Sequence, residues 1–222
     1  MKLCVFLFFI QTILAGPTPI VLWHGMGDTC CASFSLGSFK LFLEKTIPGV
    51  YVHSLRIGNS TVEDLENGYF MSPNKQIDYA CNMLARDPLL KKGQHQGVYG
   101  LPHCGALQHR SCNYIRKLLN HAAYIKWVQE SLVQATYWHD PLDEATYQTN
   151  SEFLSDVNNE LAINQTYVDN LSTLHSLVLV KFNSDTMKMD KAGKLIFLST
   201  DGDHLRMSDV WFIDNIVKPY LN

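Results

Sequence analysis

The 222-residue sequence lacks any cluster of basic residues and carries little net charge. Its 18 Lys and Arg stand against 21 Asp and Glu, which gives a formal net charge of −3. Proteins that bind nucleic acid present a concentrated basic patch, so we expect no nucleic-acid partner. The chain also has no internal repeat and no low-complexity tract. Its apolar share of 46% and charged share of 18% are typical of a globular protein and argue against a disordered one.

The sequence has no hydrophobic run long enough to span a bilayer comfortably. An apolar run covers residues 3–10, directly after Met1-Lys2, and small residues follow up to Gly16. One basic residue, a short apolar core and a small-residue end are typical of a secretory signal peptide. We predict a signal peptide over residues 1–16, with an uncleaved signal anchor as the alternative. Residues 17–222 are then expected to form a single soluble domain without a transmembrane segment.

Cysteine is scarce, and its number is odd in the chain expected after removal of the signal peptide. Five of the six cysteines remain once the signal peptide is removed, so in an oxidising compartment at least one lacks a partner. Cys104 and Cys112 close a short loop and are candidates for a bridge. Cys30 and Cys31 are also candidates, although a disulfide between adjacent residues is a strained ring. Cys81 has no obvious partner, and the pairings stay open at this point.

Three N-x-S/T triplets begin at Asn59, Asn164 and Asn170. All three lie in polar surroundings. In a secreted chain each one is a predicted site of N-glycosylation.

Apolar runs alternate with helical patterns in the first part of the chain, which indicates an α/β fold. The continuous apolar run at residues 20–23 predicts a strand buried on both faces of a parallel sheet. A helix is predicted over residues 34–45, strand character over 50–55, and helical pieces over 62–69 and 76–84.

The alternation fails in the middle of the chain. Residues 94–105, QHQGVYGLPHCG, are predicted to be a loop, and no strand precedes them. Further predicted elements are helices over 114–119 and 124–137, strands over 177–182 and 195–198, and a last helix over about 208–218.

Two loops carry candidate catalytic groups. The first predicted strand leads into HGMGD, and such a strand-to-glycine turn commonly delivers a backbone N–H to an oxyanion. Met26 is the candidate donor. For His24 the alternative is a structural role, in which its ring only holds the loop in place.

The strand at 195–198 opens onto a loop with His204 before the last helix, which suits the final member of a Ser–acid–His order. His204 is therefore a candidate general base, with a packed or surface histidine as the alternative.

No serine in the chain has the context of a nucleophile. The expected form is G-x-S-x-G on a sharp strand-to-helix turn, and this pentapeptide is absent. The nearest imitation, residues 33–37, has Ser33 in place of the first glycine and no strand before it, so we interpret it as a helix N-cap. A thiolate at Cys30 or Cys31 is a further alternative, but a disulfide is favoured in a secreted chain.

One histidine- and cysteine-rich segment invites a test for zinc. It offers His103, Cys104, His109 and Cys112. Their spacing matches no standard zinc pattern, and secretion favours a disulfide instead. His95 has no accompanying set of ligands. We therefore predict no metal and no cofactor.

Four segments carry a resemblance to a known family: IVLWHGMGDTCC, LPHCGALQHRSCNYIRKLLNHAAY, VQESLVQATYWHDPL and LIFLSTDGDHL. Over nearly the whole chain the sequence resembles the palmitoyl-protein thioesterases. The resemblance implies an α/β-hydrolase fold with a mostly parallel sheet flanked by helices. It implies hydrolysis of the thioester between a fatty acyl chain and a cysteine of an S-acylated protein. It also implies delivery through the secretory pathway to the lysosome by a glycan-dependent sorting receptor, with secretion as the alternative destination.

The chain departs from this family at two places. Family members carry the G-x-S-x-G turn, its strand and the next strand between the equivalents of Gly93 and Gln94, which are adjacent in this sequence. They also carry the triad aspartate in a long insert after the strand at 177–182. In this sequence NSDT runs directly into MKMDKAGK at that point.

The resemblance therefore carries over His204 as general base and Met26 as oxyanion donor, and it supplies no nucleophile. It leaves Cys81 unpaired, because the matching partner lies in the first missing block. Losing one central strand, with about five apolar side chains, removes about 10 kcal/mol. We expect a sheet that lacks central strands and a chain with severely impaired catalysis. The alternatives are a non-catalytic acyl- or protein-binding remnant and a misfolded splice product.

Overall fold

The computed structural model describes residues 16–90, 96–99, 122–140, 142–182, 195–201 and 207–221. Several predicted features lie outside these ranges. They are the signal peptide up to residue 15, the helix at 114–119, His204, and the segment that holds Cys104 and Cys112. The described residues include the first predicted strand, the Met26 loop and the helices around them.

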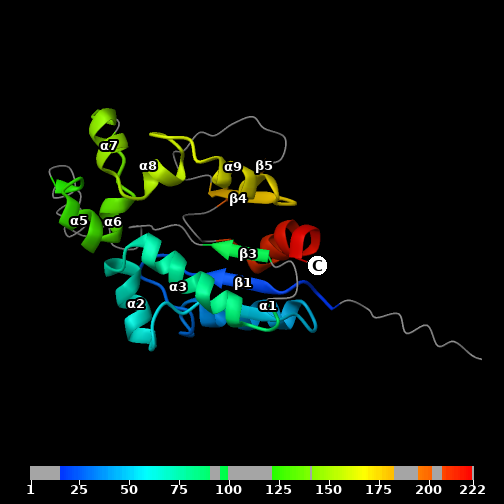
Figure 1. Ribbon diagram of the computed structural model, residues 1–222. Helices are drawn as coiled ribbons and strands as arrows, with labels where there is room; N and C mark the ends of the chain where they lie inside the picture. The colour runs from blue at the N-terminus through cyan, green and yellow to red at the C-terminus, as the bar shows by residue number, and fades with distance from the viewer. Residues whose placement is uncertain are drawn as a thin grey trace, which may run out of the picture.

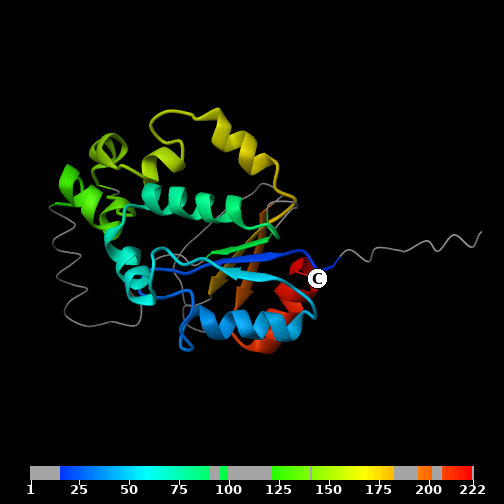
Figure 2. The ribbon, with the colours of Figure 1, turned by 60° about the horizontal axis from the view of Figure 1, so that its bottom comes forward.

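The strands form two parallel sheets (Figure 1). They are β1 (Ile20–Trp23), β2 (Val52–Ser54), β3 (Gln96–Tyr99), β4 (Leu177–Phe182) and β5 (Leu195–Thr200). The first sheet has the order β2-β1-β3, and Ile20 of the central strand pairs with both Val52 and Gln96. The second sheet pairs β4 with β5 along their whole length. In Figure 2 these two strands run across the direction of β1 rather than alongside it.

The helices of the described residues fall into three groups. The first group is α1 (Leu36–Thr46), α2 (Thr61–Phe70) and α3 (Pro73–Arg86). The second is α5 (Lys126–Ser131), α6 (Val133–Thr136), α7 (Glu144–Asn150), α8 (Leu154–Val157) and α9 (Gln165–Ser172). The last is α10 (Asp209–Phe212) and the π-helix η1 (Ile213–Leu221).

Apolar side chains of β1 are buried on both faces of the first sheet. Ile20 packs in one cluster with Leu43 of α1 and Ile216 of η1. Val21 packs in a second cluster with Ala80 of α3. Figure 2 shows the same layering, with α1 and the C-terminal helix on one side of the sheet and α3 on the other. The α/β fold class and the buried strand at residues 20–23 are therefore confirmed.

One prediction is wrong, because residues 94–105 are not all loop. Gln96–Tyr99 forms β3 and pairs with β1 along all four of its residues. A central strand with an empty edge would leave its backbone N–H and C=O groups without partners, which is costly inside a protein. This tertiary demand outweighs the weak local preference of a glycine-containing segment.

The predicted helix at 124–137 is broken in two. Leu132 has an extended backbone, with φ of −134°, and separates α5 from α6. The fully buried Gln129 holds the break together, since its Nε2 donates to the carbonyl oxygens of Ala123 and Ala135 at 2.6 and 2.7 Å. Its Oε1 accepts from the Glu152 N–H. A buried amide that satisfies several backbone groups compensates for lost helical hydrogen bonds.

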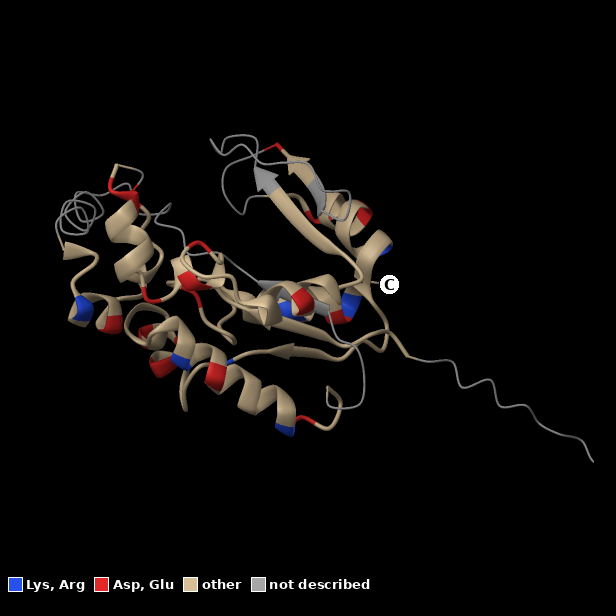
Figure 3. Cartoon of the chain, turned by 45° about the horizontal axis from the view of Figure 1, so that its top comes forward, with Lys and Arg blue, Asp and Glu red and all other residues tan. Residues whose placement is uncertain are grey.

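Basic and acidic residues are scattered over the described part of the chain, and both kinds occur on several helices (Figure 3). Among the described residues, three ion pairs join residues four apart: Lys40–Glu44, Lys126–Glu130 and Lys218–Asp214. Each such exposed pair contributes only about 0.3–0.5 kcal/mol. Within the described ranges, no helix combines the length and hydropathy needed to cross a membrane.

Replacing Gly37 by alanine is expected to destabilise the fold by about 3 kcal/mol. A Cβ at this position would lie 2.3 Å from the carbonyl oxygen of Cys31 and 2.7 Å from that of Ala32, and both are backbone atoms that cannot swing away. Gly68 is a matched control in a helix, because its Cβ would meet no atom closer than 3.8 Å. Gly68→Ala is expected to be neutral or stabilising by up to about 1 kcal/mol. Urea unfolding measures both variants, and equal effects would contradict the prediction.

Candidate functional site

The Met26 loop begins where β1 ends, at the carboxyl end of the central strand of the first sheet. In open α/β sheets, ligands bind outside the carboxyl ends of the strands. The position of Met26 in the fold is therefore one at which a binding or catalytic group is expected.

A tight turn shapes this loop. The Asp28 N–H donates to the Gly25 carbonyl oxygen at 3.2 Å, and Gly27 has a φ of 87°, which strongly favours glycine. A side chain at Gly27 would also lie 2.8 Å from the hydroxyl of Tyr69. Met26 sits inside the turn. Within the described part of the chain, its backbone N–H donates to no acceptor.

The Met26 side chain ties the loop to the second group of helices. Its Sδ accepts from Nε2 of Gln134, on α6, at 2.7 Å. Oε1 of Gln134 is buried and has no hydrogen-bond partner among the described residues. Helix α6 therefore forms one wall beside the loop.

A buried ion pair lies under the loop. His24 Nε2 is 2.9 Å from Oδ1 of Asp64, and the side chain of Asp64, on α2, is completely inaccessible to solvent. His24 Nδ1 is 2.9 Å from the Gly25 carbonyl oxygen. The Asp64 side chain, on α2, therefore holds His24, the residue that follows β1.

Asp64 also accepts two backbone hydrogen bonds. The Ile57 N–H donates to Oδ1 at 2.6 Å, and the Cys30 N–H donates to Oδ2 at 2.8 Å. The Ser54 hydroxyl donates to the Cys30 carbonyl oxygen at 2.8 Å. One carboxylate therefore joins the loops that follow β1 and β2.

The pKa values of this pair move apart in the directions that favour charge. For His24, burial lowers the pKa, but the hydrogen bonds to Asp64 and Gly25 and the nearby charges outweigh it, and the net pKa lies above 6.5. For Asp64, burial raises the pKa, but hydrogen bonds from His24 and from the Cys30 and Ile57 N–H groups bring it below 3.8. Both partners are therefore charged over a wide pH range.

Stability from this pair is expected to be greatest between about pH 4 and pH 6.5. Because the folded pKa of His24 is raised, its contribution is complete below about pH 6.5 and is lost as pH rises through the folded pKa. Because the folded pKa of Asp64 is lowered, its contribution is complete above about pH 4 and is lost as pH falls through that pKa. Urea midpoints at about pH 5.5 and pH 8.5 test this. The alkaline decline should be smaller in His24→Gln, and an equal decline in both proteins would contradict the assignment.

The structure joins Cys30 to Cys31 by a disulfide, with Cys30 buried and Cys31 exposed. Cys81 is exposed and free.

Ser35 stands at the N-cap position of α1, as the sequence predicts for this segment. Its hydroxyl contacts Asp28 and Thr29, and no imidazole of the described residues contacts it. Neither Ser35 nor the bonded cysteines have the environment of a nucleophile.

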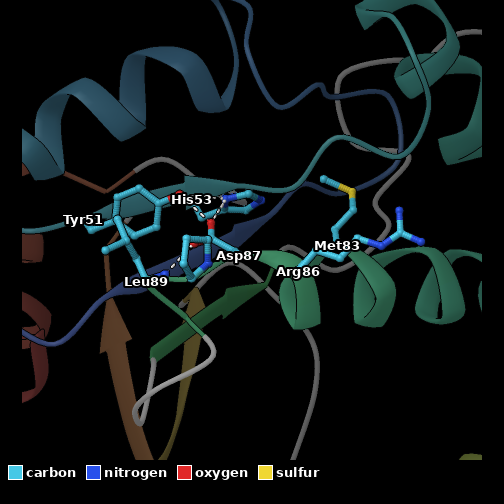
Figure 4. A pocket seen from close by; sticks show the side chains of 7 residues that line it. Tyr51, His53, Met83, Arg86, Asp87 and Leu89 are labelled. Atoms are coloured by element: carbon cyan, nitrogen blue, oxygen red, sulfur yellow. Dashed lines mark hydrogen bonds and ion pairs between the residues drawn. The ribbon is translucent and has the colours of Figure 1, made fainter.

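A second polar cluster lies at the opposite end of the sheet (Figure 4). The Tyr51 hydroxyl donates to Oδ2 of Asp87 at 2.6 Å, and Nδ1 of His53 is 3.1 Å from the same oxygen. Burial and the bond to Asp87 raise the pKa of Tyr51 to about 12. The cluster lines an open hollow of about 460 Å³ together with apolar residues such as Met83 and Leu89. It joins the start of β2 to the end of α3.

Two residues of the site were not predicted from the sequence. Asp64 lies in the first turn of a helix, where acidic residues are common, so nothing marks it as buried. Gln134 lies on a short helix whose break was itself unexpected. Among the described residues, no group of His, Cys, Asp or Glu could hold a metal ion. His204 lies outside the described ranges, as do Cys104 and Cys112 and the histidines weighed as metal ligands, His95, His103 and His109.

Comparison with known families places these features in context. The family model described as palmitoyl protein thioesterase matches residues 19–93 and 89–189. The two matched segments overlap at residues 89–93, beside the junction of Gly93 and Gln94 where the family resemblance implies a missing block.

Named relatives agree with this match. The sequence is 35% identical over 272 residues to palmitoyl-protein thioesterase 1 of Caenorhabditis elegans, which covers 91% of each chain. Because 272 exceeds the 222 residues of this chain, the relative has residues in the alignment that this chain lacks. Palmitoyl-protein thioesterase 3 of Dictyostelium discoideum is 28% identical over 218 residues, covering 86% of this chain and 73% of the relative. This chain belongs to the palmitoyl-protein thioesterase family.

Proposed function

We propose that this chain is an α/β-hydrolase-like protein of the thioesterase family whose own thioester hydrolysis is severely impaired. The observation that carries the proposal is the absence of G-x-S-x-G from the whole sequence. Hydrolysis by the family's mechanism needs a serine that attacks the acyl carbon, and neither Ser35 nor the disulfide-bonded Cys30 and Cys31 has the environment of a nucleophile. The separation of the strands into two sheets supports the loss of the central strands.

The proposal still assigns two groups of the family's mechanism to residues of this chain, the oxyanion donor and the general base. Met26 supplies a backbone N–H for the oxyanion, which the position of this residue at the carboxyl end of β1 supports. His204 is the general base. The ligands are S-acylated proteins or peptides, with the fatty acyl chain as the part recognised.

The proposal places the protein in the secretory pathway, with residues 1–16 as its signal peptide, and in the lysosome through a glycan-dependent receptor. The sequons support this. Asn59 and Asn170 are exposed, and Asn164 is half-buried at the start of α9. Exposure of an asparagine side chain is a requirement for glycan transfer to it.

Labelling with a serine-directed fluorophosphonate probe tests the proposal. The purified, secreted glycoprotein is expected to take up no probe above the level of a heat-denatured sample, because no activated serine is present. The worm relative named palmitoyl-protein thioesterase 1 serves as the comparison enzyme. Stoichiometric labelling of this chain at one serine would overturn the proposal.

A further inference from the structure

The buried contact between His24 and Asp64 has a geometry that determines its protonation. Both ring nitrogens of His24 lie 2.9 Å from oxygen atoms, one on the Asp64 carboxylate and one on the Gly25 carbonyl. A carbonyl oxygen and a carboxylate oxygen can only accept hydrogen bonds. A neutral imidazole has one N–H and would point a lone pair at one of these oxygens. An imidazolium satisfies both contacts.

Both carboxylate oxygens of Asp64 accept hydrogen bonds, which disfavours a proton on either of them. Its two oxygens together accept from His24, from the Ile57 N–H and from the Cys30 N–H. A protonated carboxyl would present an O–H toward groups that are themselves donors. The carboxylate is therefore ionised, and the pair consists of two opposite buried charges.

The second contact of His24 acts on the candidate oxyanion donor. The Gly25 carbonyl and the Met26 N–H belong to the same peptide unit. In a trans peptide the C=O and N–H point in opposite directions, so a bond that holds the carbonyl oxygen also aims the N–H. Nδ1 of His24 and the Asp28 N–H both hold this oxygen from within the protein. The Met26 N–H is then directed away from them.

We propose that His24, protonated and held by Asp64, is a positioning residue that aims the Met26 N–H, and that loss of its proton releases this peptide. The inference deepens the oxyanion role proposed for Met26. The charged groups that face His24 are Asp64, from α2, and Asp28, from its own loop. Both are acidic, so both favour the imidazolium. The Met26 peptide is therefore held in acid and released as pH rises.

Nuclear magnetic resonance on the full secreted chain tests this. Selective ¹⁵N labelling of methionine reports the Met26 amide, which Met26→Leu identifies, and ¹⁵N labelling of histidine reports the His24 ring. In the parent protein the ring is expected to carry two N–H groups at about pH 5. The Met26 amide resonance should shift with the same midpoint as the ring, above pH 6.5.

Three variants separate positioning from general structure. Asp64→Asn should lower the shared midpoint by about one pH unit or more, since it removes the carboxylate that favours the imidazolium. His24→Gln should abolish the Met26 titration. Glu144→Gln removes the partner of His139 in an exposed pair of similar length, 2.8 Å, and should change neither resonance.

Two results would overturn the proposal. One is a His24 ring with a single N–H at about pH 5. The other is a Met26 amide that stays unchanged while His24 titrates. Either result can be observed on the parent protein alone. The proposal can therefore be contradicted even if one of the variants fails to fold. None of these readouts requires turnover, so they are independent of the fluorophosphonate labelling.

Discussion

The purified chain is expected to hydrolyse a palmitoyl thioester about a millionfold more slowly than a family enzyme that has the serine. Removing the nucleophile of a triad costs about this much, because the remaining groups can only bind and polarise the acyl carbon. A remaining oxyanion hole can keep about a thousandfold over water. The second N–H donor of that hole normally belongs to the residue after the nucleophile, which this chain lacks. Even the remaining activity is therefore expected to be small. A continuous assay of released thiol, with the worm relative measured alongside, gives the ratio.

His204→Ala is the internal control for this measurement. The role proposed for His204 is to activate the serine that is missing here, so the substitution should leave the remaining rate unchanged. Turnover by the parent chain that exceeds the His204→Ala rate would contradict the prediction, because it would require an activated nucleophile. Acyl-chain binding without turnover, measured on the folded protein, would favour the role of a binding remnant.

Replacing Asp64 by alanine is expected to lower the free energy of unfolding by about 3–5 kcal/mol. The variant leaves the His24 imidazolium without its counter-charge, and it leaves the Cys30 and Ile57 N–H groups without an acceptor. Each of these is a buried group, and unsatisfied buried donors cost about 1–3 kcal/mol each. Urea unfolding at about pH 5.5, where the pair is fully charged, measures the loss.

Glu144→Ala is the matched control for this variant. It also removes a carboxylate that pairs with a histidine, but 49% of the Glu144 side chain and 41% of the His139 side chain are exposed. Water replaces the lost partner there, so the expected change is below about 1 kcal/mol. If Asp64→Ala lowered the free energy of unfolding no more than Glu144→Ala, the prediction that the buried Asp64 carboxylate stabilises the fold would be wrong.

The local elements that sequence patterns predicted best are those with strong intrinsic signals. The apolar runs at 20–23 and 177–182 form β1 and β4 with the predicted bounds, because a continuous apolar run favours a strand of a parallel sheet. The first three residues of β1 are buried, whereas the first four residues of β4 are half-buried. The helix at 62–69 is Thr61–Phe70, with Ser60 capping it through a hydrogen bond from the Glu63 N–H. Boundaries moved by a few residues where no cap was evident.

Long-range demands decided the features that local patterns missed. Gln96–Tyr99 became a strand because β1 needed a partner on that edge. The helix predicted at 124–137 broke at Leu132 because the buried amide of Gln129 supplies alternative hydrogen bonds. The first signal lies on a strand distant in the sequence, and the second depends on the burial of Gln129, so local periodicity reveals neither.

By itself, the sequence determined the α/β class, the loop that follows β1, and the absence of a serine turn, since each depends on residues adjacent in the chain. Only the tertiary structure decided that Asp64 is buried and that its carboxylate meets His24 across 40 residues of sequence. Burial and charge pairing depend on which elements pack together, and a single acidic residue in the first turn of a helix carries no mark of that packing.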